Sequence, residues 1–168
     1  IMVAETIRSD SRGIIDCDVH HVPVDDSELV KRFPAYFRTR GLVLPSGFGI
    51  KNPSGVLRED AAGPNGEPAG SLPELMKQQL LDAFGIDYAI LICAKVLGVG
   101  VHPEVDFAKV IAAAYNDWLI EGWLSPDVDN RFLGSIVVSQ VDPESAAHEI
   151  RRVGGHPKVV QVVMTSAT

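Results

Sequence analysis

Apolar and polar positions recur along the chain with two different periods, which together predict the order of its elements. Short apolar runs predict four strands, over residues 14–21, 86–93, 131–138 and 158–164. Apolar residues spaced three and four apart predict helices over residues 27–36, 71–84, 103–122 and 142–153. Strands joined by helices imply a parallel sheet with right-handed crossovers, so we expect an α/β fold. Two architectures remain open on these grounds: a doubly wound sheet and part of a (β/α)8 barrel, which needs about 250 residues.

The predicted helices carry their own start and stop signals. Ser71 and Asp142 stand at N-cap positions, each with a proline close behind. Gly85 and Gly154 mark helix ends. The residues expected to face the core share helical spacing: Met76, Leu80, Ala83 and Phe84; then Ala108, Ile111, Ala112, Tyr115, Trp118, Leu119 and Gly122; and then Ala146, Ala147 and Ile150.

A long segment between the first two predicted strands holds glycine or proline every few residues. So many breakers preclude regular structure over residues 41–70. Loops of this length inside a compact domain are usually either functional or disordered. Because the segment follows a polar strand, we expect it to be an inserted active-site loop.

The first strand concentrates ionisable groups on one side. Alternation places Asp16, Asp18 and His20 on one face, opposite the apolar half of the strand, Ile15, Cys17 and Val19. A carboxylate and an imidazole two residues apart on a strand can hold one cation from the same side. A local hydrogen-bonded pair is the simpler alternative. The third polar group favours metal binding by Asp18 and His20.

Further polar residues follow the carboxyl ends of the predicted strands, where parallel α/β folds bind ligands. They are Lys95 after the second strand, Ser139 and Gln140 after the third, and Thr165 and Ser166 after the fourth. Lys95 is a candidate contact for a substrate carboxylate, with a solvated loop lysine as the default. His21 points away from the polar face if the strand persists, so packing is favoured over a role in substrate binding.

Composition and charge exclude some classes of function. The net charge of −7 leaves no basic stripe for nucleic acid or for an anionic membrane, and no apolar run is long enough to span a bilayer. The two cysteines, Cys17 and Cys93, lie in predicted strands and are expected to be buried, reduced thiols of a cytoplasmic protein. No nucleotide-binding motif or nucleophile elbow is present.

These residues and their order resemble a known group. The motif that contains Asp16, Asp18 and His20, followed by the breaker-rich loop, is similar to the N-terminal half of the amidohydrolase-related metal-dependent hydrolases. Their branch also contains aminocarboxymuconate semialdehyde and resorcylate decarboxylases. Further similar segments are residues 74–82, 87–91, 115–119, 131–136 and 160–162.

The resemblance implies a (β/α)8 barrel with one divalent cation at its mouth. Residues 1–168 are then a single, partial barrel domain, its N-terminal half. The first strand of the family normally supplies His-x-His, and the matching positions here are Asp18 and His20. A carboxylate makes the site harder, so manganese or magnesium becomes plausible beside zinc. The family's remaining ligands and its catalytic base would lie beyond Thr168.

The implied activity is hydrolysis of a C–N or ester bond in a small acidic or aromatic substrate. The alternative within the group is non-oxidative decarboxylation of a hydroxyaromatic carboxylate. An alternative of another class is a non-catalytic, self-associating half-barrel, because two parallel edges would remain open. The expected partners are a small-molecule substrate and further copies of the chain.

Overall fold

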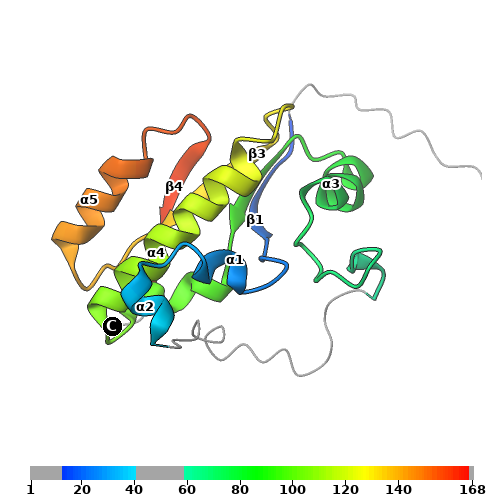
Figure 1. Cartoon of the computed structure of the whole chain (residues 1–168). Helices are drawn as coiled ribbons and strands as arrows, with labels where there is room; N and C mark the ends of the chain where they lie inside the picture. The colour runs from blue at the N-terminus through cyan, green and yellow to red at the C-terminus, as the bar shows by residue number, and fades with distance from the viewer. Residues whose placement is uncertain (1–12, 41–58, 167–168) are drawn as a thin grey trace, which may run out of the picture.

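A computed structural model describes residues 13–40 and 59–166 of the chain. Its centre is a four-stranded sheet in which every strand is parallel to its neighbours, in the order β1-β2-β3-β4 (Figure 1). The strands are β1 (Ile15–His20), β2 (Tyr88–Ile92), β3 (Phe132–Val137) and β4 (Val159–Val163). The prediction of an α/β fold with a parallel sheet is confirmed.

Helical segments connect the strands. They are α1 (Ser27–Val30), α2 (Ala35–Thr39), the 3-10 turn η1 (Glu59–Ala61), α3 (Pro73–Met76) with its π-helical continuation η2 (Lys77–Asp82), the 3-10 helix η3 (Ala94–Val101), α4 (Val105–Leu119) with its π-helical continuation η4 (Ile120–Leu124), and α5 (Pro143–Val153). The single helix predicted over residues 27–36 is wrong. Pro34 disfavours helical backbone in the residue before it, so the segment divides into α1 and α2.

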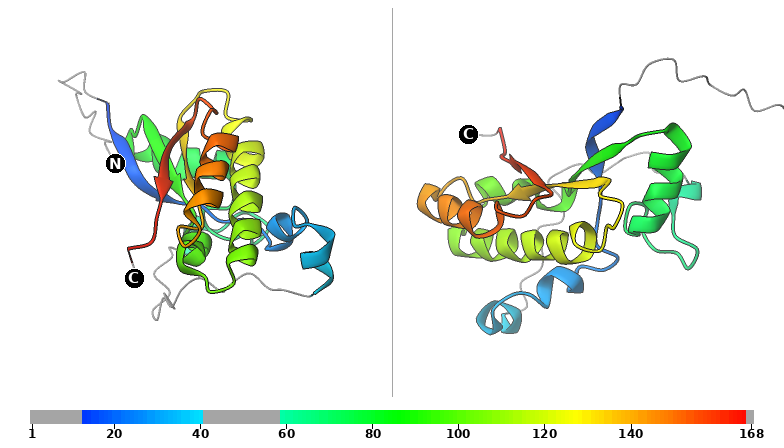
Figure 2. Two further views of the ribbon diagram at one scale, coloured as in Figure 1. Left: turned by 90° about the vertical axis from the view of Figure 1, so that its left-hand side faces the viewer. Right: turned by 90° about the horizontal axis from the view of Figure 1, so that it is seen from above.

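Helices α4 and α5 cover one face of the sheet, and no described helix covers the other (Figure 2). The predicted inward face of α4 is confirmed from Ala108 to Leu119, whereas Gly122 is exposed. Gly122 lies in η4, where the wider π-helical turn changes which residues face the sheet. The Asp142 carboxylate caps α5 by accepting a hydrogen bond from the Ser145 backbone N–H at 3.1 Å, as predicted. Ile150 is more exposed than predicted, at 39%.

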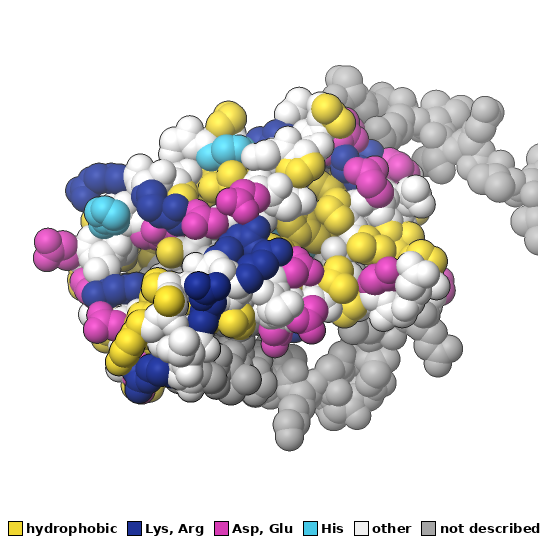
Figure 3. All heavy atoms as spheres, viewed as in Figure 1, with side chains coloured by type: hydrophobic (Ala, Val, Ile, Leu, Met, Phe, Trp, Pro, Cys, Tyr) yellow, Lys and Arg dark blue, Asp and Glu magenta, His cyan; other side chains and the backbone are white. Residues whose placement is uncertain are grey.

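The helix between β1 and β2 differs most from its prediction. Its N-cap is Leu72, and the Ser71 side chain makes no capping hydrogen bond. The π-helical turn shifts the inward position from Leu80 to Leu81, which is fully buried. Phe84, predicted to be inward, is 63% exposed. Figure 3 shows hydrophobic side chains gathered at the surface between the sheet and this helix.

Gly134 on β3 lets α4 and η4 approach the sheet closely. A Cβ atom there would lie 2.7 Å from Leu124 Cδ1 and 3.0 Å from Leu119 Cδ2. We expect Gly134→Ala to lower the free energy of unfolding by about 1–3 kcal/mol, measured by urea denaturation, because the helix must move outward. Gly155→Ala is the control, since a Cβ there meets no atom within 4 Å. Equal stability of the two variants would contradict the close approach.

Candidate functional site

Strand β1 contains a β-bulge that changes which side chains share a face. Asp16 pairs with Ala89 of β2, but Val19 pairs with Leu91, so β1 has one extra residue in this interval. Ala89 and Leu91 lie on the same, helix-covered face, and Asp16 and Val19 therefore face that way too. The expectation that Asp16 joins Asp18 on one face is wrong. Instead, Asp16 Oδ1 accepts a hydrogen bond from the Asp18 backbone N–H at 3.1 Å.

The apolar half of β1 also differs from its prediction. Val19 is buried, whereas Ile15 is 54% exposed and the Cys17 thiol is exposed. Ile15 is exposed because it pairs with Tyr88 on the face that no described helix covers, and β1 is also an edge strand. Cys93 is buried as predicted, and burial raises the pKa of its thiol to about 11.

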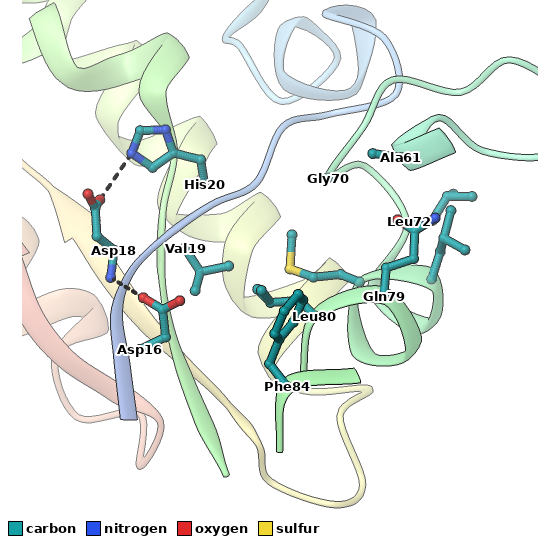
Figure 4. Close-up of a pocket in the computed structure, with 12 residues that line it drawn as sticks. Asp16, Asp18, Val19, His20, Ala61, Gly70, Leu72, Gln79, Leu80 and Phe84 are labelled. Carbon is teal, nitrogen blue, oxygen red and sulfur yellow. Dashed lines mark hydrogen bonds and ion pairs between the residues drawn. The ribbon is translucent and has the colours of Figure 1, made fainter. Parts of the chain in front are cut away.

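Asp18 and His20 do come together, at the carboxyl end of β1. The His20 Nε2 atom lies 3.0 Å from Asp18 Oδ1, and their side chains are 50% and 75% exposed. His20 pairs with Ile92, the last residue of β2, so both donors project from the uncovered face of the sheet. Figure 4 shows the two side chains turned toward one another and away from Val19.

The spacing of these two atoms suits a shared metal ion. Two donors that each bind a cation at roughly 2.1 Å, at tetrahedral or octahedral angles, are about 3.0–3.4 Å apart. A carboxylate oxygen with an imidazole nitrogen is a donor set for zinc or manganese. Within residues 13–40 and 59–166, no group of three or more potential ligands is present. The described residues could thus offer two donors to one cation, and metal binding by Asp18 and His20 stays a prediction.

His21 lies in the interior, beside this pair in sequence but not in space. Its ring stacks on Trp118 with centroids 5.2 Å apart and meets Trp123 edge-on at 4.9 Å. It is fully buried, and neither ring nitrogen has a hydrogen-bond partner among the described residues. Burial lowers the pKa of His21 to about 3, which keeps the ring neutral. This position provides packing and leaves no surface of the ring for a substrate.

Lys95 follows β2 at the same edge of the sheet as the Asp18–His20 pair. Its ammonium group forms an ion pair with Asp26 Oδ1 at 2.6 Å, and its side chain is 39% exposed. The lysine is therefore held by a carboxylate of the loop that follows β1. Its role in substrate binding stays a prediction.

The polar residues that follow β3 and β4 hold the loops together. The Gln140 side chain donates to the Thr165 carbonyl and accepts from the Thr165 N–H, both at 2.9 Å. The Thr165 hydroxyl donates to the Leu97 carbonyl at 2.6 Å. We call this set the Gln140 bridge. Ser139 is buried and Ser166 is exposed, and neither joins it.

A pocket of about 300 Å³ lies between β1 and the α3–η2 helix. Asp16, Asp18, Val19 and His20 of β1 all line it, with the Asp16 and Val19 side chains toward its apolar walls and the Asp18 and His20 side chains turned the other way (Figure 4). Its other walls are mainly apolar and include Leu72, Met76 and Leu80. The Asp18–His20 pair therefore lies at the border of a largely apolar pocket.

Part of the predicted active-site loop is described. Residues 41–58 lie outside the described residues. Residues 59–70 form turns, and the Gly70 carbonyl accepts a hydrogen bond from the Val22 N–H at 3.0 Å. The end of this segment is therefore fixed beside the end of β1.

The sequence prediction missed a buried charge cluster at the amino end of β3. The Asp127 carboxylate, 1% exposed, lies 2.8 Å from Lys77 Nζ and 3.2 Å from Lys158 Nζ. Lys77 also pairs with Asp129 at 2.5 Å. Burial alone lowers the pKa of Lys77, but hydrogen bonds to both aspartates outweigh it and raise the pKa. One sequence signal could have indicated this cluster: Lys77 lies on a helix face whose other residues are apolar.

None of the helices that the structure describes is long and apolar enough to cross a membrane. Comparison of the chain with protein-family models and with curated proteins found no match.

Proposed function

We propose that this chain is the N-terminal half of a metal-dependent (β/α)8 hydrolase barrel of the amidohydrolase-related type. Asp18 and His20 would hold one divalent cation at the mouth. The observation that carries the proposal is their 3.0 Å donor separation on the uncovered face, at the carboxyl end of a parallel strand. Parallel α/β folds place their chemistry at that edge.

The residues of this chain prepare the cation site in distinct ways. Asp16 accepts a hydrogen bond from the Asp18 backbone and so holds the bulge that aims Asp18 and His20 at one point. His20 must offer a lone pair on Nε2, so its proton resides on Nδ1 when a cation is bound. A bound cation polarises a carbonyl or carboxylate and lowers the pKa of water.

The reaction proposed first is hydrolysis of a C–N or ester bond, with decarboxylation as the alternative at the same site. The Lys95 ammonium group follows β2 at this edge of the sheet. Its positive charge favours a substrate that carries a carboxylate. Such a substrate would have to compete with Asp26 for the ammonium group. Both reactions need the same cation, so metal binding is the property to test first.

Metal content tests the assignment directly. We expect the purified chain to bind zinc or manganese, and Asp18→Ala combined with His20→Ala to lower the affinity at least tenfold, measured by calorimetric titration and elemental analysis. Asp106→Ala combined with His148→Ala is the matched control, because it removes an exposed carboxylate and an exposed imidazole elsewhere. Undiminished metal binding by the Asp18–His20 double variant would refute the proposal.

A further inference from the structure

Helices α4 and α5 lie side by side on the covered face of the sheet and leave a cavity of about 310 Å³ between them (Figure 2). We call it the α4–α5 cavity. Its walls come from one face of each helix and from the segment that follows β3, and they include Lys109, Ala112, Ala113, Ser139, Glu149 and Arg152. The cavity therefore involves neither the uncovered face of the sheet nor the edges formed by β1 and β4.

One buried polar group in the wall of this cavity lacks a partner. Ser139 is 3% exposed, and its hydroxyl forms no hydrogen bond with any described residue. By contrast, the buried Asn116 amide at the same junction of α4 and β3 bonds to Val137 through both its oxygen and its nitrogen. Because buried hydroxyls are normally hydrogen-bonded, Ser139 favours a ligand with a polar group at this depth.

The charged side chains that line the cavity favour an anion. Ion pairs join the two helices at two levels, Lys109 to Asp142 at 2.7 Å and Arg152 to Asp117 at 2.6 Å. Both cations line the cavity, whereas neither aspartate does. With the carboxylate of Glu149, the lining carries two positive charges and one negative charge at pH 7.

Both cations keep an N–H group for a ligand. The Lys109 ammonium group has three donors, and its ion pairs with two aspartates, at 2.7 and 3.3 Å, use two of them. The Arg152 guanidinium has five donors, and hydrogen bonds to Glu149, Asp117 and the Ala113 carbonyl use four of them. Each cation therefore has one N–H without a partner among the described residues.

The size of the cavity suits an organic molecule better than a bare ion. A volume of about 300 Å³ is the lower end of the range for small-molecule sites. Ala112 and Ala113 have small apolar side chains, against which an apolar part of a ligand can pack. Carboxylate and phosphate groups accept several charge-assisted hydrogen bonds at once, so either group matches the donors of this wall.

We propose that the α4–α5 cavity binds a small organic anion, whose carboxylate or phosphate group accepts hydrogen bonds from Lys109, Arg152 and Ser139. The Asp18–His20 pair takes no part in this site, so the proposal does not rest on the function proposed above.

Binding of two simple anions tests the site. The isotope-labelled native chain is titrated at constant ionic strength with phenyl phosphate, with benzoate and with uncharged benzyl alcohol, and backbone amide shifts are followed by NMR. We expect saturable shifts at Lys109 and Ser139 with at least one of the anions, at a Kd of about 1 mM or lower, and none with benzyl alcohol. The anion that binds more tightly identifies the head group.

Three variants assign the binding groups. Ser139→Ala and Lys109→Gln should each weaken binding about tenfold or more, because each removes a hydrogen bond to a charged group. Ser139→Ala should not lower the Tm, because it removes a hydroxyl that has no partner in the described fold. Lys31→Gln, at an exposed position after α1, changes the net charge equally and is the control.

The proposal would be overturned by no saturable shift at Ser139 with either anion, by equal shifts with benzyl alcohol, or by an unchanged Kd in Ser139→Ala. The Asp18→Ala, His20→Ala double variant should bind the anion as the native chain does, which distinguishes failure of this site from failure of the metal site. Circular dichroism shows whether each variant is folded, and the titration of the native chain decides if one is not.

Discussion

Replacing Asp127 by alanine is expected to lower the free energy of unfolding by about 3 kcal/mol or more, measured by urea denaturation. The Asp127 carboxylate is 1% exposed and ion-paired with Lys77 and Lys158. It also accepts a hydrogen bond from the Phe132 N–H at 2.9 Å, at the start of β3. Alanine would leave the Lys77 charge with less compensation and that N–H without an acceptor.

Two further variants separate charge from hydrogen bonding. Asp127→Asn keeps an acceptor for Phe132 but removes the charge, so we expect an intermediate loss of stability. Asp106→Ala removes a carboxylate that is 88% exposed and should change stability by less than about 0.5 kcal/mol. Similar stability of Asp127→Ala and Asp106→Ala would show that the buried cluster contributes nothing.

His21 is expected to make the fold sensitive to acid. Its folded-state pKa of about 3 lies below its ordinary value of 6.5. Between these two values the unfolded chain binds a proton and the fold does not, so stability falls as pH decreases. The loss amounts to about 1.4 kcal/mol per pH unit, or about 4 kcal/mol between pH 6.5 and pH 3.5.

Comparison with His21→Phe isolates this contribution from that of other titrating groups. Phenylalanine keeps an aromatic ring between Trp118 and Trp123 and cannot be protonated. The stability of the native chain relative to this variant should therefore decrease from pH 7 to pH 3.5. His148→Ala, at an exposed position, should keep the full pH dependence. A constant difference between the native chain and His21→Phe would contradict the burial of a neutral ring.

The period of the apolar residues predicted the strands and the face of α4 well. Each strand lies within a residue or two of its prediction, because a buried parallel strand needs a nearly continuous apolar run. The N-cap role of Asp142 was also predicted correctly, because its hydrogen bond joins residues only three positions apart. Local signals of this kind can be read from one sequence.

The predictions that were wrong concern places where the regular spacing of apolar residues in a strand or helix is interrupted. A single extra residue in β1 places the Asp16 and Asp18 side chains on different faces of the sheet. A π-helical turn makes Leu81, in place of Leu80, the buried residue of its helix. Neither interruption has a local signature, because each follows from packing against distant residues. The Asp18–His20 pair was predicted correctly to lie together, since both side chains turn away from Val19, which stands between them in the sequence.

The partners within the buried ion cluster could not be predicted, even though the position of Lys77 on an apolar helix face was a signal that it is buried. Lys77 and Asp127 are 50 positions apart, and either would ordinarily be assigned to the surface. Only the tertiary fold shows that the turn before β3 meets the helix that precedes β2. Charge partners across such a distance are invisible to periodicity.

The Gln140 bridge has a consequence for how this scaffold can diversify. It ties the starts of three connecting segments to one another through main-chain groups of Thr165 and Leu97. Each bond needs the Gln140 or Thr165 side chain and one main-chain group, but no side chain that the segments carry farther along. Insertions or exchanges beyond these anchor points therefore leave the three bonds in place, so the loops at this end of the sheet can vary in sequence while the sheet keeps its geometry.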